Sequence, residues 1–290
     1  MFKGRKYLFI FLTGLFIFFM VTFTGCGKQK DNGQTSPVSG TLTIVGSTAM
    51  QPLVEEAAAK FQTKNPQVQI VVQGGGSGTG LTQVAQGAAD IGNSDIEAHE
   101  KEGIEASQLT GTKICVVGIA VVINPNCKIK NLSKKQLKDI FTGKITNWKE
   151  VGGSNQRIVL VNRPKGSGTR ITFKKFALDG AEEAKGMESD SSGVVRQIIS
   201  NTPGAIGYLA LPYVNDTVNT LSIDGYAPTK ENIISGKYPV WAYQYMYTKG
   251  QPAGLKKIFL DYMLNTEVQT TIVPDLGYIP ITAMKVTRDK

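Results

Sequence analysis

Two short stretches far apart in the chain combine glycines with hydroxyl side chains, and each precedes a stretch with a helical pattern. They are Gly74-Gly75-Gly76-Ser77-Gly78-Thr79-Gly80 and Arg163-Pro164-Lys165-Gly166-Ser167-Gly168-Thr169. Glycine lets the backbone bend so that successive N–H groups point at one spot, and a helix N-terminus favours negative charge there. The two loops therefore predict a tetrahedral oxyanion that is held from two sides by hydrogen bonds.

Two more segments carry the same kinds of group after short β runs: Gly46-Ser47-Thr48 and Asn93-Ser94-Asp95. Their hydroxyls can donate or accept, and Arg163 offers a planar fork of donors that matches an oxyanion. Taken singly, each Ser or Thr could be an ordinary helix cap and each glycine cluster an ordinary turn. Four such segments, each after a strand, instead predict one shared anion site.

Asp95 is a carboxylate within this predicted anion site. It can accept a hydrogen bond from an oxyanion that still carries a proton, as phosphate does near neutral pH, and it repels sulfate, which carries none. Alternatively, Asp95 caps a helix that starts near Ile96. The sequence leaves both interpretations open.

The elements that must position these residues alternate between strand and helix from Thr41 onward, which predicts an α/β fold. In the first part we expect strands at 42–45, 69–73, 89–92 and 114–123, and helices at 50–63 and 81–87. Thr48 and Gln51 are expected to form a capping box for the first helix, and Asn65-Pro66 to end it.

The second part repeats this alternation. We expect a helix after Ser133, strands at 158–161, 205–209 and 240–248, a helix after the second glycine loop, and helices near 194–200 and at 255–265. Two long strands that flank a central α/β block predict a chain that crosses between two Rossmann-like lobes and returns. Ligands of such sheets lie at the carboxyl ends of strands, so both glycine loops should face one cleft.

The N-terminus has the pattern of an export signal. Basic residues precede an apolar run at 7–23, which Thr24-Gly25-Cys26 follows. This predicts a lipoprotein signal peptide over 1–25 and a lipid on Cys26; the alternative is an uncleaved membrane anchor. The polar residues up to 40 then form a flexible tether over 26–40. Either alternative places the rest of the chain outside the cytoplasm.

Composition and spacing exclude several classes of function. The formal charge of +9 falls to +6 without the signal, and the lysines are scattered, so no nucleic-acid partner is expected. His99, the only histidine, lies in a polar segment; neither a nucleophile elbow, a nucleotide-binding loop nor a metal-ligand spacing occurs. We therefore expect no catalytic residue, metal or cofactor. Cys115 and Cys127 lie too far apart along the chain's long apolar strand for a disulfide and should be free thiols.

Six segments, in order, resemble the phosphate-binding lipoproteins of bacterial phosphate ABC importers. They are Gly46 to Met50, Gly74 to Gly80, Gly92 to Asp95, Leu137 to Trp148, Arg163 with Gly166 to Thr169, and Pro203 to Tyr208. The resemblance runs from about Thr41 to the C-terminus and includes the lipidation motif before it.

This resemblance implies a periplasmic-binding-protein type II fold, with lobes at 41–122 plus 240–290 and at 123–239 that close on phosphate. It implies phosphate contacts from Thr48, Ala49, Ser77, Asp95, Arg163, Ser167, Gly168 and Thr169, to which the neighbours Ser47 and Ser94 are added. For Ala49 the resemblance implies a contact through the backbone N–H alone, because some family members have a bulky aromatic residue at this position.

The implied partners are inorganic phosphate, the permease subunits of an ABC importer, and the outer face of the cell membrane through the lipid on Cys26. A monomer is expected. Two alternatives keep the fold: another oxyanion such as sulfate or molybdate, or a surface adhesin or phosphate sensor without transport. A phosphatase that uses Ser167 or Ser77 is disfavoured because the chain lacks a partner histidine for either serine.

Overall fold

The structure, a computed structural model, describes residues 38–288. The predicted signal peptide, the lipidation site Cys26 and the tether up to residue 37 lie outside the described residues. The described residues belong to a single unit by their contacts. Across residues 38–288, none of the helices has the length and apolar character needed to span a membrane.

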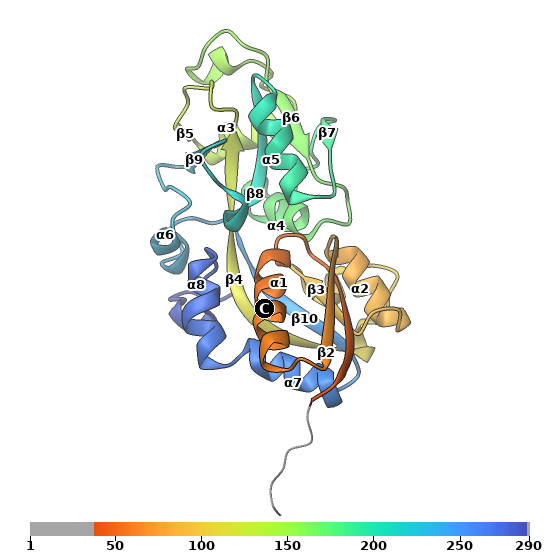
Figure 1. The fold of residues 1–290 in the computed structure, drawn as a ribbon. Helices are drawn as coiled ribbons and strands as arrows, with labels where there is room; N and C mark the ends of the chain where they lie inside the picture. The colour runs from red at the N-terminus through yellow and green to blue at the C-terminus, as the bar shows by residue number, and fades with distance from the viewer. Residues whose placement is uncertain (1–37, 289–290) are drawn as a thin grey trace, which may run out of the picture. The chain divides into compact units, whose positions relative to one another are not determined.

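The first lobe is built on four strands in the order β2-β1-β3-β10, with β4 beside β10 (Figure 1). β1 pairs in parallel with β2 and β3, whereas β10 runs antiparallel to both β3 and β4. The bounds of these strands and of the helices in this lobe are β1 Gly40–Gly46, α1 Gln51–Lys64, β2 Val68–Gly75, α2 Ser77–Gln86, β3 Ile91–Ser94, β4 Leu109–Ile123, β10 Trp241–Lys249, α7 Gly254–Met263 and α8 Val273–Asp275.

The second lobe continues the same sheet from β4 through β8 and β6 to β7 (Figure 1); β9 also pairs with β4, and β5 pairs with β9. β8 is antiparallel to β4, and β6 is parallel to β8. Its elements are β5 Asn131–Leu132, α3 Lys134–Phe141, β6 Val159–Asn162, α4 Gly168–Ala177, β7 Met187–Glu188, α5 Ser192–Asn201, β8 Ala205–Ala210 and β9 Asn219–Ile223; α6 Lys230–Ile234 follows before β10.

β4 belongs to both lobes. Its residues up to Gly118 pair with β10, and Ile119 to Ile123 pair with β8. Its second half is buried on both faces, which explains the uninterrupted apolar sequence. The chain returns through Pro239 into β10, so the two lobes are joined by two crossovers, as predicted for this fold class.

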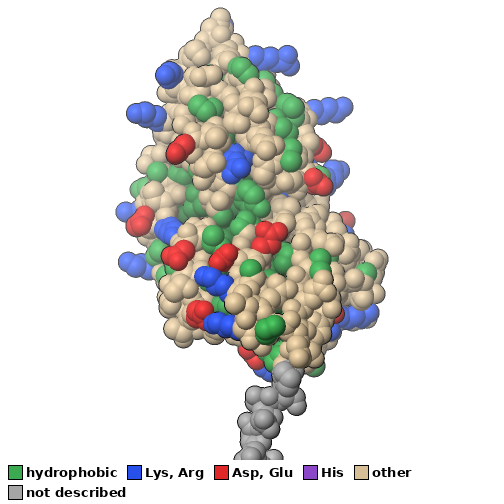
Figure 2. All heavy atoms as spheres, viewed as in Figure 1, with side chains coloured by type: hydrophobic (Ala, Val, Ile, Leu, Met, Phe, Trp, Pro, Cys, Tyr) green, Lys and Arg blue, Asp and Glu red, His purple; other side chains and the backbone are tan. Residues whose placement is uncertain are grey.

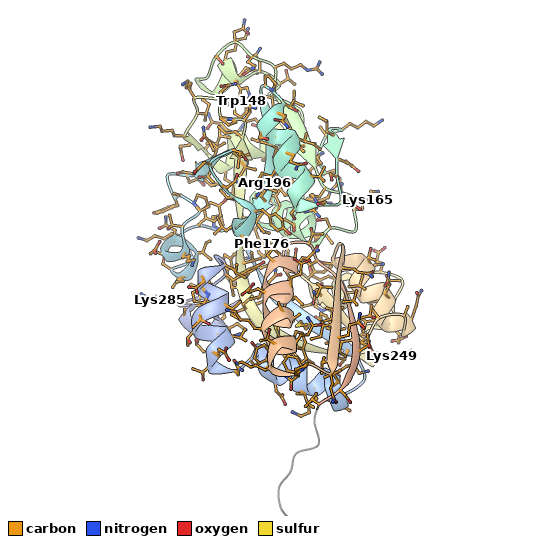
Figure 3. All side chains as sticks on the ribbon, in the orientation of Figure 1. Trp148, Lys165, Phe176, Arg196, Lys249 and Lys285 are labelled. Carbon is orange, nitrogen blue, oxygen red and sulfur yellow. The ribbon has the colours of Figure 1, made fainter. Side chains whose placement is uncertain are left out.

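Aromatic side chains fill the core of each lobe. In the first lobe the rings of Phe61 and Phe259 meet edge to face at 5.4 Å. In the second lobe Phe173 stacks on Tyr208 at 4.1 Å, and Trp148 is buried at the end of the lobe far from the first (Figure 3). Each lobe therefore has a packed interior that can hold its edge loops in place.

The start of the first helix differs from the prediction. α1 begins at Gln51 with Met50 as N-cap and has no side-chain cap. The Thr48 hydroxyl instead meets Arg163 and Ser192 of the second lobe. The expected capping box is therefore wrong, because tertiary contacts take the hydroxyl that the local pattern assigns to the helix. The predicted end at Asn65 is confirmed.

Two other differences concern element bounds. α2 begins at Ser77, inside the glycine loop, because its N-cap Gly76 has a φ of 88°, a conformation that favours glycine. The prediction also missed the short strands β5, β7 and β9, the helix α6, and the helical turns after α7, at Val268–Ile272 and α8.

Charged side chains are spread over the visible face, with Lys and Arg lying among Asp and Glu (Figure 2). This distribution agrees with the scattered lysines of the sequence. Cys115 and Cys127 are both buried and free, which confirms the prediction of unpaired thiols.

Candidate functional site

The Asp95 carboxyl lies where the two lobes meet. Ser47 from the end of β1 donates a hydrogen bond to Oδ1, and Thr169 from the first turn of α4 donates to Oδ2 at 2.9 Å. Asp95 is 4% exposed. One carboxyl group thus accepts hydroxyl hydrogen bonds from both lobes.

The two glycine loops contact each other beside this carboxyl. The Asp95 N–H donates to the Ser77 hydroxyl at 2.9 Å, and the Gly78 N–H donates to the Gly166 carbonyl at 2.9 Å. Gly168 lies so close that a Cβ there would stand 2.3 Å from Ser77 Oγ. The loops predicted to face one cleft therefore come together.

Asp95 does not cap a helix. The next helical turn is the short 3-10 segment Ala98–Glu100. The Ile96 N–H donates to the Ser94 hydroxyl and not to Asp95. The alternative interpretation of Asp95 is therefore wrong. Burial raises the pKa of the Asp95 carboxyl, and the hydroxyl bonds and the charge of Arg163 oppose that shift.

The Arg163 guanidinium is also buried at this point, with 1% of the residue exposed. Its Nε donates to the carbonyl of Ser189 at 2.9 Å and its Nη2 to that of Asp190 at 2.6 Å. Nη2 also donates to Thr48 Oγ1 and Nη1 to Ser192 Oγ, each at 3.1 Å. All four acceptors are neutral, so the positive charge remains available to an anion.

A second layer of side chains holds the Arg163 backbone. Its N–H donates to the Tyr208 hydroxyl at 3.2 Å, and its carbonyl accepts from Arg170. Arg170 in turn pairs with the buried carboxyl of Glu183 at 2.8 Å. Burial raises the pKa of Glu183, and the charge of Arg170 opposes the shift. This network fixes the backbone of Arg163 and so helps to position its guanidinium.

The remaining predicted residues lie at the starts of helices. Ser47 accepts from the N–H of Ala49 at 3.1 Å, just before α1. Ser167 caps α4 by accepting from the Arg170 N–H at 3.3 Å, and Gly168 is the first residue of that helix. Amide groups in the first turn of a helix have no partner within the helix, so they are suited to an anion.

The structure thus brings nine of the predicted residues together, and all nine are buried: Ser47, Thr48, Ala49, Ser77, Asp95, Arg163, Ser167, Gly168 and Thr169. Ser94 is adjacent, but its hydroxyl donates to the Ile96 carbonyl at 2.8 Å. Its side chain therefore serves the local turn.

Three residues of this region were missed. Ser192 reaches Arg163 and Thr48 from the start of α5, and the tyrosines Tyr213 and Tyr278 donate to the carbonyls of Thr48 and Ala49, each at 2.7 Å. A Ser-Ser-Gly sequence before a helix could have indicated Ser192. No local pattern marks the tyrosines, because their partners lie 165 and 229 residues away.

The arrangement can bind a small oxyanion that does two things at once. It must accept from the Arg163 guanidinium and the hydroxyls, and it must tolerate or donate to the Asp95 carboxyl. His99 is largely exposed and pairs with Glu97. Among residues 38–288, no group of three or more His, Cys, Asp or Glu side chains could hold a metal ion. The side chains that meet at this site supply hydrogen bonds and charge.

Comparison with known proteins connects this geometry to a family. Residues 32–267 match the PBP superfamily domain. The phosphate-binding protein PstS of Bacillus subtilis (strain 168) is 53% identical over 293 residues, which is 99% of this chain and 98% of that protein. A substrate-binding protein from Clostridium perfringens, solved with bound phosphate, superposes with a TM-score of 0.77 at 34% identity and covers 83% of this chain and 100% of its own.

An ABC-type phosphate transport receptor from Vibrio cholerae superposes with a TM-score of 0.66 at 26% identity, covering 82% of this chain and 99% of its own. The match in sequence thus spans almost the whole chain, and the match in structure spans both lobes. The chain therefore belongs to the PBP superfamily and, within it, to the PstS family of phosphate-binding proteins.

Proposed function

We propose that this protein captures inorganic phosphate between its two lobes and delivers it to the permease of a phosphate ABC importer. One observation carries this proposal. A buried site holds the guanidinium of Arg163, which donates only to neutral acceptors, and the carboxyl group of Asp95, and hydroxyls from both lobes surround them. Like these relatives, the chain is a binding protein; it is not an enzyme.

The proposed donors come from both lobes. From the first lobe they are the Thr48 and Ser77 hydroxyls, and from the second the Arg163 guanidinium, the Ser167 hydroxyl and the Gly168 N–H. The Ser47 and Thr169 hydroxyls donate to Asp95 in this structure, and the Ala49 N–H donates to Ser47. These three groups would donate to phosphate by exchanging those acceptors for it. Because closure removes water from the anion, each of these hydrogen bonds is stronger there than in solvent.

Asp95 is the proposed filter for protonation. Phosphate near neutral pH carries a proton that it can donate to a carboxylate oxygen, and sulfate does not. An ionised carboxylate beside a sulfate oxygen would have two negative charges in contact in a site of low dielectric. The selection of phosphate over sulfate then depends on repulsion by the Asp95 carboxylate as well as on the attractive hydrogen bonds.

We also propose the lobe boundaries and the hinge. Residues 41–122 plus 240–290 would move as one body and 123–239 as the other, bending near Val122 and Pro239. β4 changes partner from β10 to β8 at Gly118 to Ile119, close to the first of these points. A hinge placed at two strands lets the cleft open without disturbing either core.

The cellular setting is part of the proposal. The Clostridium perfringens relative is a substrate-binding protein of a phosphate ABC transporter. The predicted lipid on Cys26 would tether this chain to the outer face of the cell membrane. The permease subunits would then be the membrane partners that receive phosphate.

Isothermal titration tests the function. The chain from Ser36 onward, stripped of bound anion, would be titrated with phosphate alone and with phosphate in the presence of sulfate. One-to-one binding of phosphate that sulfate does not displace is the expected result. A protein that binds sulfate and phosphate alike, or neither, would overturn the proposal.

A further inference from the structure

Ser192 lies between the two lobes, and the proposed function above gives it no role. It is the first residue of α5, and none of its surface is exposed. Its hydroxyl oxygen lies 3.1 Å from Arg163 Nη1 and 3.0 Å from Thr48 Oγ1. It therefore touches two proposed phosphate ligands, one on each lobe.

The hydrogen atoms around this hydroxyl can be counted. Arg163 donates to both Ser192 and Thr48, and the two hydroxyls share one hydrogen bond in which either can be the donor. Two hydroxyl hydrogens are present and one is used between them. One hydroxyl hydrogen therefore remains to be donated to an anion held by the same guanidinium.

The segment that carries Ser192 wraps around Arg163. The carbonyls of Ser189 and Asp190 accept from Nε and Nη2, and the Ser192 hydroxyl accepts from Nη1. Three acceptors within four residues thus fix the plane of the guanidinium. Since an arginine fork recognises an oxyanion only in a defined orientation, the segment prepares Arg163 for its ligand.

The neighbouring serine has a different environment. Ser191 is the N-cap of α5, is partly exposed, and accepts from the Val194 N–H at 3.4 Å. The two adjacent hydroxyls thus have different roles: that of Ser191 caps the helix, and that of Ser192 faces the space between the lobes.

From these contacts we infer that Ser192 is a further positioning residue of the phosphate site, which orients Arg163 and Thr48 toward one phosphate oxygen and links the two lobes around it. This inference rests on the proposed phosphate binding. A further segment, from the second lobe, would then contribute to the affinity beside the four segments predicted from the sequence.

The test uses Ser192→Ala, with Ser191→Ala as the matched control on the same helix. Inorganic phosphate would be titrated into both variants and the unchanged protein, and the dissociation rate and ligand-free melting temperature would be measured. Loss of a hydrogen bond to a charged group predicts roughly ten- to a hundred-fold weaker phosphate binding for Ser192→Ala, mostly as faster dissociation. Ser191→Ala should lower the melting temperature by a few degrees and leave affinity within about two-fold.

Ser192→Cys guards against a cavity-induced folding defect, since it fills the space of the side chain with a slightly larger atom and weakens its hydrogen bonds. It should show the same loss of affinity. In a double-mutant cycle with Thr48→Ala, the two losses should be less than additive because the two hydroxyls share a bond.

Two failures can be told apart. If the unchanged protein does not bind phosphate, the proposed function fails and this inference with it. If the unchanged protein binds phosphate and Ser192→Ala binds it equally well, or if only the melting temperature falls, Ser192 is structural and the inference alone is overturned.

Discussion

Gly168 at the start of α4 lies against Ser77 at the start of α2, with no room between them for another carbon atom. A Cβ at position 168 would stand 2.3 Å from Ser77 Oγ and 2.9 Å from Asp95 Cβ. The first residues of two helices from different lobes thus meet at the site. Such an approach brings both sets of free N–H groups close to the same anion.

Gly168→Ala should therefore prevent full closure. The first turn of a helix tolerates alanine well, so the second lobe should fold normally, while the added methyl group separates the lobes. We expect phosphate affinity to fall by roughly a hundred-fold or more, since losing two hydrogen bonds to a charged anion costs about 3 kcal/mol. Gly166→Ala is the matched control, because a Cβ at 166 meets nothing within 4 Å. Titration of both variants with phosphate decides; equal affinities would mean that the lobes do not close to this distance.

Tyr208→Phe should weaken phosphate binding without any contact to phosphate. The Tyr208 hydroxyl accepts from the Arg163 N–H, and its removal leaves a buried N–H without that acceptor at a cost of roughly 1 to 3 kcal/mol. Part of that cost would appear as a displaced guanidinium and a weaker complex.

The control for this variant is Tyr238→Phe. The Tyr238 hydroxyl is equally buried and donates to the Ile119 carbonyl at 3.0 Å, away from Arg163. Thermal melts should show both variants destabilised, and calorimetry should show reduced phosphate affinity only for Tyr208→Phe. A parallel loss in both would assign Tyr208 to general stability.

Local chemistry predicted much of this site. The glycine loops and the segments ending in Thr48 and Asp95 were identified because each follows a strand, and parallel strands bring their carboxyl ends to one edge. The long apolar run of β4 likewise indicated one continuous strand. These features depend on residues close together in the chain, so their pattern is visible in the sequence.

What the sequence could not predict depends on distant partners. Thr48 has the pattern of a helix cap, yet its hydroxyl is bonded from a residue 115 positions away. Ser191 and Ser192 are the same residue type, yet Ser191 is the extended N-cap of α5 and Ser192 is its first helical residue. One hydroxyl therefore caps the helix and the other reaches Arg163. β9 was missed because its partners, β4 and β5, lie almost a hundred residues earlier.

Arg288 should hold the C-terminal segment against both lobes. Its guanidinium lies 3.5 Å from the ring centre of Phe176 on α4 and 3.8 Å from that of Trp241 at the start of β10. It also donates to the carbonyls of Trp241 and Pro239. Phe176 lies where the second lobe meets the first (Figure 3). The contact therefore spans one of the two crossovers.

Arg288→Ala should lower the stability of the protein by about 2 kcal/mol, the scale of a partly buried cation–π contact with its hydrogen bonds. Lys285→Ala is the control, since Lys285 is exposed on the same segment (Figure 3). Denaturant melts of the ligand-free variants provide the measurement. A change below about 0.5 kcal/mol for Arg288→Ala would show that the segment is not held by this side chain.

Asp95→Asn should admit sulfate. The amide keeps one acceptor oxygen and gains an N–H donor, so it no longer repels an anion without a proton. We expect phosphate to bind more weakly, because it loses a charged acceptor, and sulfate to become a competitor at least roughly ten-fold stronger than against the unchanged protein. Competition titration measures both. An Asn variant that still excludes sulfate would remove Asp95 from its proposed role.

Acid should reproduce part of this effect in the unchanged protein. Burial raises the pKa of Asp95 above its usual 3.8, so the carboxyl becomes protonated at a higher pH than a free aspartate does. As pH falls through that raised pKa, the group changes from an acceptor to a donor, and sulfate should begin to compete with phosphate. The folded protein then binds more protons than the unfolded chain, so this group's contribution to stability should increase as pH falls toward 3.8. Asp95→Asn should show neither trend, and sulfate competition with the same pH dependence in both proteins would assign the effect to another group.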